Sequence, residues 1–361
     1  MSDTLPSVLK DTLAHIRSVP SRFRIEAEQR LHQLTKPPGS LGELETIAAR
    51  CYAIAEGRWS VPLRKAAYVF AADHGVTQEG VSAYPSAVTA QMVENFLHGG
   101  AAINVLARLH EVTLTIIDVG VDAQFSAHDA LWLRKVRRAS RNFRVEPAMS
   151  PAELSEALQV GLEAADDAHK RDARLVAAGE MGIGNTTAAS ALAAAITRQP
   201  VEGVTGMGTG ISSTTRQSKQ KVIGEALDRH LPRWRTEPVE PLEALRCVGG
   251  LEIAAMTGFF LGAARHRKII IADGFIATAA AAVAVALAPP VRDYLLAGHR
   301  SEEPGHAHLL HHIGLTPILD LRMRLGEGTG AVLAMPIVAS ALHILTEMAT
   351  FASAGVSTAN A

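Results

Sequence analysis

Short apolar segments that end in an acidic residue or a glycine recur along this sequence, and they constrain its fold more than any other feature. Each is four to six residues long and is followed by a longer stretch of helical character. They occupy residues 66–71, 112–117, 175–178, 269–272 and 294–297. Such a pattern is typical of parallel strands that helices cover on both faces. We therefore predict an α/β fold with a doubly wound, mostly parallel, Rossmann-like sheet.

The residues that end these segments indicate where a ligand would bind. Asp73, Asp118 and Asp273 closely follow three of them, and Gly179-Glu180 follows another. In open parallel sheets, ligands bind at the carboxyl ends of the strands. We therefore expect the functional side chains at that edge of the sheet.

The two ends of the chain differ from its middle. Residues 1–50 are charged and amphipathic, and residues 331–352 form an apolar stretch of helical character. We expect both ends to pack together as a small helical subdomain, formed by residues 1–54 and 331–361, beside an α/β catalytic domain of residues 55–330. Residues 228–241 contain three prolines and several charges, which indicates a surface connection.

Composition excludes several classes of partner. The 35 Lys and Arg residues are balanced by 36 Asp and Glu residues, so the formal net charge of −1 argues against nucleic acid or an anionic membrane as partner. Two cysteines cannot build a disulfide framework, and the amino terminus has no export signal, so we expect a soluble, cytoplasmic protein.

Residues 269–289 have the length of a membrane span, but Asp273 interrupts them. We predict a buried strand, a turn and a buried helix over residues 275–287 instead.

A glycine-rich loop at residues 179–187 (GEMGIGNTT) is the most informative local motif. A predicted strand enters it and an Ala-rich helix leaves it, so backbone N–H groups and threonine hydroxyls could surround an anion. Asn185 stands where a nucleotide-triphosphate loop needs lysine, which favours a single phosphate. A tight strand-to-helix turn without a ligand is the alternative.

Two further glycine turns carry one charged candidate each. Residues 206–210 (GMGTG) precede Lys219, which could supply the positive charge that the first loop lacks, although a lone lysine is more often solvated. Residues 326–330 (GEGTG) place Glu327 between two glycines, a position that suits a general base with a pKa raised by burial. An exposed loop carboxylate is the other interpretation of Glu327.

Metal and nucleophilic chemistry have weaker support. His306 and His308 would lie on opposite faces of a strand, and the adjacent His311 and His312 are a poor chelate, so we expect no metal. Ser82 lacks the second glycine of a nucleophile elbow.

Six motifs, taken together and in order, resemble the nicotinate-nucleotide–dimethylbenzimidazole phosphoribosyltransferase family of cobalamin lower-ligand assembly. They are residues 36–42 (KPPGSLG), 71–76 (AADHGV), 79–85 (EGVSAYP), 179–187, 273–276 (DGFI) and 324–331 (RLGEGTGA), and the likeness extends from about residue 20 to Val356. The resemblance implies transfer of phosphoribose from nicotinate mononucleotide to dimethylbenzimidazole, without cofactor or Mg²⁺, by a homodimer.

The resemblance also implies roles for particular residues. Glu327 would be the base that takes the proton of dimethylbenzimidazole, and inversion at the anomeric carbon would give α-ribazole phosphate. The substrate-binding residues would be Ser82, Tyr84 and Gln91 around the aromatic base, Glu180, Gly182, Asn185 and Thr186 around ribose and phosphate, Lys219 near the phosphate, and Asp273 and Ser301 near the ribose phosphate and nicotinate.

The sequence departs from the family pattern at two places. Met207 stands where the family often has arginine, and Ala139-Ser140 replaces a common Gly-Thr. Two rival functions stay open: a non-catalytic ribotide-binding protein, against which the retained Glu327 argues, and a phosphorylase, which would need a further cationic site.

Overall fold

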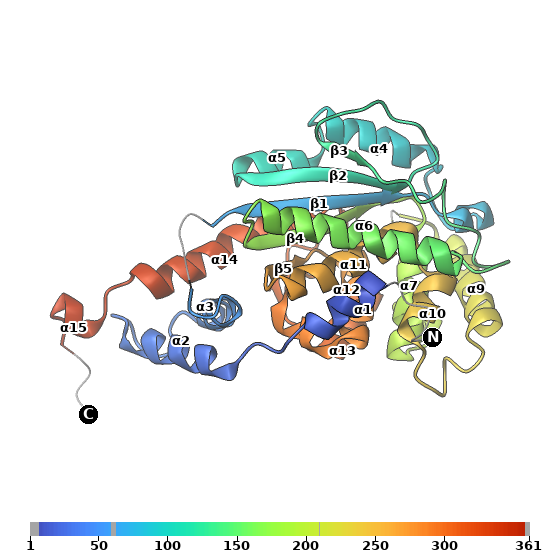
Figure 1. Cartoon of the computed structure of the whole chain (residues 1–361). Coiled ribbons are helices and arrows are strands. Elements are labelled where there is room, and N and C mark those ends of the chain that lie inside the picture. The colour runs from blue at the N-terminus through green and yellow to red at the C-terminus, as the bar shows by residue number, and fades with distance from the viewer. Residues whose placement is uncertain (1–6, 59–62, 209, 358–361) are drawn as a thin grey trace.

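The computed structural model describes residues 7–58, 63–208 and 210–357, and a seven-stranded sheet forms its centre (Figure 1). Every strand pairing is parallel, in the order β3-β2-β1-β4-β5-β6-β7. The strands are β1 (Lys65–Ala72), β2 (Val112–Gly120), β3 (Leu131–Leu133), β4 (Leu175–Met181), β5 (Ile269–Ala272), β6 (Leu295–His299) and β7 (Pro317–Leu319). The predicted doubly wound α/β fold is confirmed.

The five predicted strands correspond to β1, β2, β4, β5 and β6, and the two edge strands were not predicted. β3 and β7 are three residues long and pair on one side only. Strands this short carry no periodicity that could be recognised. β7 also begins with Pro317, which an edge strand tolerates because one side of it needs no N–H donor.

Helices cover both faces of the sheet. On one face lie α6 (Pro151–Lys170), α11 (Leu251–Arg265) and α12 (Phe275–Leu287), and on the other lie α4 (Ala87–Leu97), α5 (Ala102–Leu109) and α14 (Thr329–Glu347). Figure 1 shows α4 and α5 above β2, with α6 across the opposite side of the sheet. The remaining helices are α7 (Asn185–Thr197), α8 (Val201–Val204), α9 (Ser213–His230), α10 (Pro241–Val248), α13 (Pro304–Ile313), α15 (Phe351–Ala354) and the 3₁₀ turns η2 (Gly75–Glu79) and η3 (Pro289–Tyr294).

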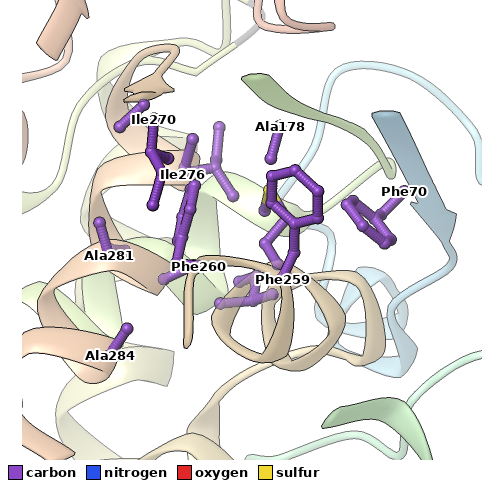
Figure 2. Packing of buried hydrophobic residues seen from close by; sticks show 14 of the residues in the cluster. Phe70, Ala178, Phe259, Phe260, Ile270, Ile276, Ala281 and Ala284 are labelled. Atoms are coloured by element: carbon purple, nitrogen blue, oxygen red, sulfur yellow. The ribbon is translucent and has the colours of Figure 1, made fainter. Parts of the chain in front are cut away.

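Aromatic residues gather where β1 meets α11. The Phe259 ring lies 5.3 Å from that of Tyr68 and 5.9 Å from that of Phe70, all fully buried. Figure 2 shows Phe259 and Phe260 between Phe70 and the small side chains of α12, such as Ala281. Alanine dominates α12, so this helix packs closely on its neighbours, and the expected buried helix over residues 275–287 is confirmed.

The two ends of the chain meet. α2 (Ser21–Gln33) and α3 (Glu43–Ile54) pack against α14, and Arg30 Nε donates a hydrogen bond of 2.7 Å to the Leu345 carbonyl. α1 (Ser7–His15) instead packs on α6 and α11. The division into residues 55–330 and residues 1–54 with 331–361 stays a prediction; residues 1–6 and 358–361 lie outside the described part.

The apolar stretch at residues 331–352 is not one continuous helix. α14 begins earlier, at Thr329, and ends at Glu347, after which Met348 is extended and α15 follows. By length and composition alone, α14 is the one described helix that would suffice to cross a membrane, and 56% of its apolar window is buried within the fold.

Candidate active site

A pocket opens at the carboxyl ends of β4, β5 and β6, the edge of the sheet at which ligands were expected. Glu180 enters it from β4, Asp273 follows β5, and Ser301 follows β6. It brings together six of the predicted substrate-binding residues: Glu180, Gly182, Asn185, Thr186, Asp273 and Ser301.

The glycine-rich loop connects β4 to α7 as predicted. Gly182 has no room for a side chain, since a Cβ there would lie 2.3 Å from the Ala72 carbonyl oxygen. Asn185 begins α7 and its amide donates a hydrogen bond to the Glu180 carboxylate. Burial, followed by the nearby carboxylates of Glu252, Asp273 and Glu327, raises the pKa of Glu180 well above its ordinary value.

Lys219 is buried rather than solvated. It lies on α9, its side chain is fully covered, and its Nζ donates a hydrogen bond of 2.8 Å to Thr186 Oγ1. Burial lowers the pKa of Lys219 to about 8, so the amine still carries positive charge at neutral pH. This charge lies directly behind Thr186, a residue that lines the pocket.

The turn at residues 206–210 is held from two sides. The Gly208 N–H donates a hydrogen bond of 2.8 Å to Glu303 Oε1, and Arg324 Nη1 donates one of 2.9 Å to the Gly208 carbonyl. Met207 is 41% exposed and Thr209 lies outside the described residues. The Gly208 N–H is therefore already occupied, and the turn supplies shape rather than charge.

Asp273 organises the loop that precedes α14. Its Oδ1 accepts a hydrogen bond of 2.9 Å from the Ala331 N–H, and its Oδ2 accepts one of 3.2 Å from Gly328. Burial raises the pKa of Asp273 to about 6, although these backbone N–H groups oppose the shift. Asp273 thus caps the first turn of α14 while it also lines the pocket, and its assignment to substrate binding stays a prediction.

Glu327 is buried and lies in a left-handed backbone conformation. Its φ is 64°, its neighbours Gly326 and Gly328 have φ values of 81° and 88°, and the residue is 4% exposed. Its Oε2 has no hydrogen-bond partner among the described residues. Burial, followed by the Asp273 carboxylate, raises the pKa of Glu327 to about 7 against an opposing hydrogen bond from the Ile103 N–H. Non-glycine residues with positive φ are uncommon and cluster at functional sites.

Glu327 lies beside the pocket and does not line it. The Ile103 N–H that reaches its carboxylate belongs to the first turn of α5, on the face of the sheet that α4 also covers. Gly326 makes this approach possible, because a Cβ there would lie 2.2 Å from Glu180 Oε1. The same loop therefore faces two sides: Gly326 lies against the pocket, and Glu327 lies against α5.

Ser82, Tyr84 and Gln91 are not brought into the pocket. Ser82 and Tyr84 lie in the segment that leads into α4, and Gln91 lies on α4 itself. Tyr84 is 51% exposed, Gln91 is exposed and Ser82 is half-buried. Their assignment to the aromatic base stays a prediction.

Comparison with known proteins decides the family. A family model described as Phosphoribosyltransferase matches residues 16–356. The chain is 48% identical over 350 residues to the nicotinate-nucleotide–dimethylbenzimidazole phosphoribosyltransferase of Geobacter sulfurreducens, covering 97% of this chain and 98% of that protein. The enzyme of the same name from Chloroflexus aurantiacus is 49% identical over 97% of this chain and 99% of its own length. This chain belongs to the nicotinate-nucleotide–dimethylbenzimidazole phosphoribosyltransferase family.

Solved structures agree with this assignment. The crystal structure of CobT from Thermus thermophilus superimposes with a TM-score of 0.89 at 48% identity, and covers 94% of this chain and 100% of that chain. The fold is therefore shared along nearly the whole length of the two chains.

In this phosphoribosyltransferase, two histidines hold the backbone around the pocket. His306 Nδ1 accepts a hydrogen bond of 2.9 Å from the Ser301 N–H, and its Nε2 lies 2.9 Å from Thr278 Oγ1. His299 Nε2 accepts one of 2.8 Å from the Leu321 N–H. Burial lowers the pKa of both imidazoles, that of His306 to about 3. Spacing along the chain carries no signal for such contacts.

A buried ion pair lies against the glycine-rich loop of residues 179–187. His74 Nε2 lies 2.6 Å from Glu252 Oε1, with both side chains fully buried. Burial works against the charged imidazole, but the Glu252 carboxylate outweighs it and raises the pKa of His74. Among the described residues, no group of three or more His, Cys, Asp or Glu side chains could hold a metal ion.

Proposed function

We propose that this chain transfers phosphoribose from nicotinate mononucleotide to dimethylbenzimidazole, giving nicotinate and α-ribazole phosphate with inversion at the anomeric carbon. The observation that carries the mechanism is Glu327, a buried carboxylate whose Oε2 is unpartnered among the described residues, on a loop that also borders the pocket. Membership of the family, with full-length relatives of this name, supports the reaction.

The phosphoribosyl group would occupy the pocket. The Thr186 hydroxyl, the amino terminus of α7 and the Lys219 charge behind them together suit a phosphate monoester. The buried carboxylate of Asp273, with a pKa of about 6, would then favour the positive charge that develops on the ribose ring.

The chemistry needs one base and no acid. One ring nitrogen of dimethylbenzimidazole forms a bond to the anomeric carbon while the bond from that carbon to the pyridinium nitrogen breaks. The electron pair of the broken bond stays on the pyridine nitrogen and removes the positive charge of the leaving ring. The second ring nitrogen loses its proton to Glu327. A pKa of about 7 suits this role, because the carboxylate is deprotonated in part at neutral pH and still basic enough to accept the proton.

The base would approach from the side of α4 and α5. Ser82, Tyr84 and Gln91 belong to that side, and their exposure in one chain supports a base site that a second subunit covers. We propose accordingly that the enzyme acts as a homodimer, and that it does so in the cytoplasm. Size-exclusion chromatography with light scattering tests the dimer: a monomer at assay concentration contradicts it.

Incubation of the protein with nicotinate mononucleotide, with and without dimethylbenzimidazole, tests the function. Nicotinate release that requires the base supports the transferase. No release supports a ribotide-binding protein, and release driven by inorganic phosphate supports a phosphorylase; either result overturns the proposal.

A further inference from the structure

A second pocket lies at the opposite edge of the sheet, just before β4 and β5 begin. It has a volume of about 280 Å³ and is lined by residues at the ends of α3, α6 and α11. It shares no described residue with the pocket at the carboxyl ends of the strands. Its permanently charged side chains are Arg58, Arg174, Arg267 and Lys268, against the carboxylates of Glu56 and Asp172. We call it the amino-edge pocket.

Positive charge exceeds negative charge in the amino-edge pocket. Glu56 is shared by two arginines, since Nη2 of Arg58 lies 2.9 Å from its Oε2 and Nη2 of Arg267 lies 3.1 Å from its Oε1. Arg174 Nε lies 3.3 Å from Asp172 Oδ1, in a pair that water reaches and therefore weakens. Two carboxylates thus face four cations, and Lys268 is the cation that neither of them contacts.

Lys268 is buried without a polar partner. The residue is 3% exposed, and its Nζ forms no hydrogen bond or ion pair with any residue that the structure describes. Burial, followed by the charge of Arg174, lowers the pKa of Lys268 to about 8 against the opposing carboxylate of Asp172. The amine is therefore still mostly protonated at neutral pH. A buried charge without a partner is costly, which points to an anion supplied from outside the chain.

The ammonium group of Lys268 is not needed to cap the helix that precedes it. Cations at the end of a helix often bind its last carbonyl groups. At the end of α11, however, backbone groups already do so. The Lys268 N–H donates a hydrogen bond of 2.9 Å to the Ala263 carbonyl, and the Arg267 N–H donates one of 2.9 Å to the Ala264 carbonyl. The side chain of Lys268 is thus left available to a ligand in the pocket.

The pocket suits a small dianion. Its volume lies at the lower end of the range for small-molecule sites, and its excess of two positive charges matches the charge of a phosphate group near neutral pH. The stacked rings of His169 and His266, with centroids 4.2 Å apart, form one flat wall. We propose that the amino-edge pocket binds a phosphate dianion, free or as a small phosphate monoester, through Lys268, Arg174 and Arg58, at a site separate from the transfer reaction.

Thermal unfolding of the full-length chain measures this binding, with sodium chloride replacing sodium phosphate to keep the ionic strength constant. The Lys219→Met variant is the starting point, because it lacks the charge proposed for phosphate at the other edge of the sheet. Its Tm rises by about 2 °C or more in about 10 mM phosphate, since a ligand that binds only the folded chain stabilises it. Adding Lys268→Met abolishes the rise, and adding Arg174→Gln reduces it. Lys170→Met is the matched control: this exposed lysine ends α6 outside the pocket lining, and its loss leaves the rise unchanged.

The stability of Lys268→Met without phosphate separates a binding site from a structural role. The substitution removes a buried charge that lacks a partner, so its Tm equals or exceeds that of the wild type. A lower Tm would show that Lys268 stabilises the fold itself, and would overturn the proposal. A rise in Tm that sodium chloride reproduces, or that Lys268→Met leaves intact, would overturn it too.

Ribose 5-phosphate distinguishes the two forms of the ligand. A rise in Tm equal to that in phosphate assigns the site to the phosphate group alone, and a larger rise assigns it to a monoester; no rise with either contradicts the proposal. The rate of phosphoribosyl transfer in Lys268→Met stays within about twofold of the wild type, because Lys268 and Glu327 lie at opposite edges of the sheet. Failure of phosphate binding and failure of the proposed function are therefore observed in separate assays.

Discussion

The Ala331 N–H donates a hydrogen bond of 2.9 Å to Oδ1 of Asp273, so a residue that follows β5 fixes the beginning of α14. Because Oδ2 of the same carboxylate accepts the Gly328 N–H, both oxygens hold the loop that contains Glu327. The geometry of the proposed base therefore depends on a carboxylate that itself takes no part in proton transfer.

Replacing Asp273 by alanine removes both acceptors at once. We expect the free energy of unfolding to fall by about 1–3 kcal/mol, since buried N–H groups lose their partners, and the transfer rate to fall as the loop loosens. Urea unfolding and steady-state kinetics measure the two effects. Asp129→Ala, at an exposed position, is the control. Full activity in Asp273→Ala would show that the loop holds its shape without this cap.

Removal of the proposed base tests the mechanism directly. Glu327→Gln keeps the shape of the side chain and removes its basicity, so the transfer rate falls by about 10²- to 10⁴-fold with the fold intact. Single-turnover release of nicotinate measures the rate, and circular dichroism checks the fold. Undiminished turnover would remove Glu327 from its role.

The pH dependence of the rate follows from the same group. A general base works when deprotonated, so with a pKa of about 7 the wild-type rate rises about tenfold per pH unit below that value and levels off above it. In Glu327→Gln this rise disappears. A wild-type profile that is flat between pH 5 and 8 contradicts the assignment.

Stability responds to pH in the opposite direction. Because the fold raises the pKa of Glu327 from 4.5 to about 7, its contribution to the free energy of unfolding is complete below about pH 4.5 and is lost as the pH rises to about 7. Above that pH, Glu327→Gln is more stable than the wild type, by up to about 3 kcal/mol. Thermal unfolding at pH 5 and pH 8 measures the difference in stability between Glu327→Gln and the wild type, which should be larger at pH 8.

A buried lysine behind a phosphate site should act on donor binding. Lys219→Met preserves the size of the side chain and removes its charge, so KM for nicotinate mononucleotide rises about 10- to 100-fold, with a smaller effect on KM for dimethylbenzimidazole. Lys221→Met, on the same helix with a side chain that is 73% exposed, is the control. Equal changes in both KM values would count against a phosphate contact.

The aromatic cluster at the β1–α11 interface sets a stability prediction. Phe259 is fully buried and touches three aromatic rings, so Phe259→Ala lowers the free energy of unfolding by about 3–5 kcal/mol. Leu133→Ala, at a 45% exposed edge-strand position, costs less than about 1 kcal/mol. Chemical denaturation of both variants gives the comparison.

Local sequence patterns determine the centre of this fold and leave its periphery open. The buried strands could be predicted because helices cover both faces of the sheet. A strand in such a sheet needs an unbroken apolar run, such as residues 66–71. The loops at residues 179–187 and 326–330 were found because backbone turns near a ligand need glycine.

The rest depends on contacts between residues far apart in the sequence. Glu303 and Arg324 reach Gly208 across about a hundred positions, and no pattern marks such a pair. The capping role of Asp273 required knowing where α14 begins. Tyr84 and Gln91 could be assigned only through the family resemblance, and a single chain leaves both exposed.

The contact between α14 and the helices α2 and α3 has a consequence for synthesis. A ribosome releases α2 and α3 early; they can pack on each other, but the face of α3 that packs on α14 stays uncovered until α14 has emerged as well. The acidic group at position 327 is made just before α14, and Asp273 cannot secure it before Ala331 exists. The loop that holds Glu327 therefore reaches its final geometry only after α14 has been made.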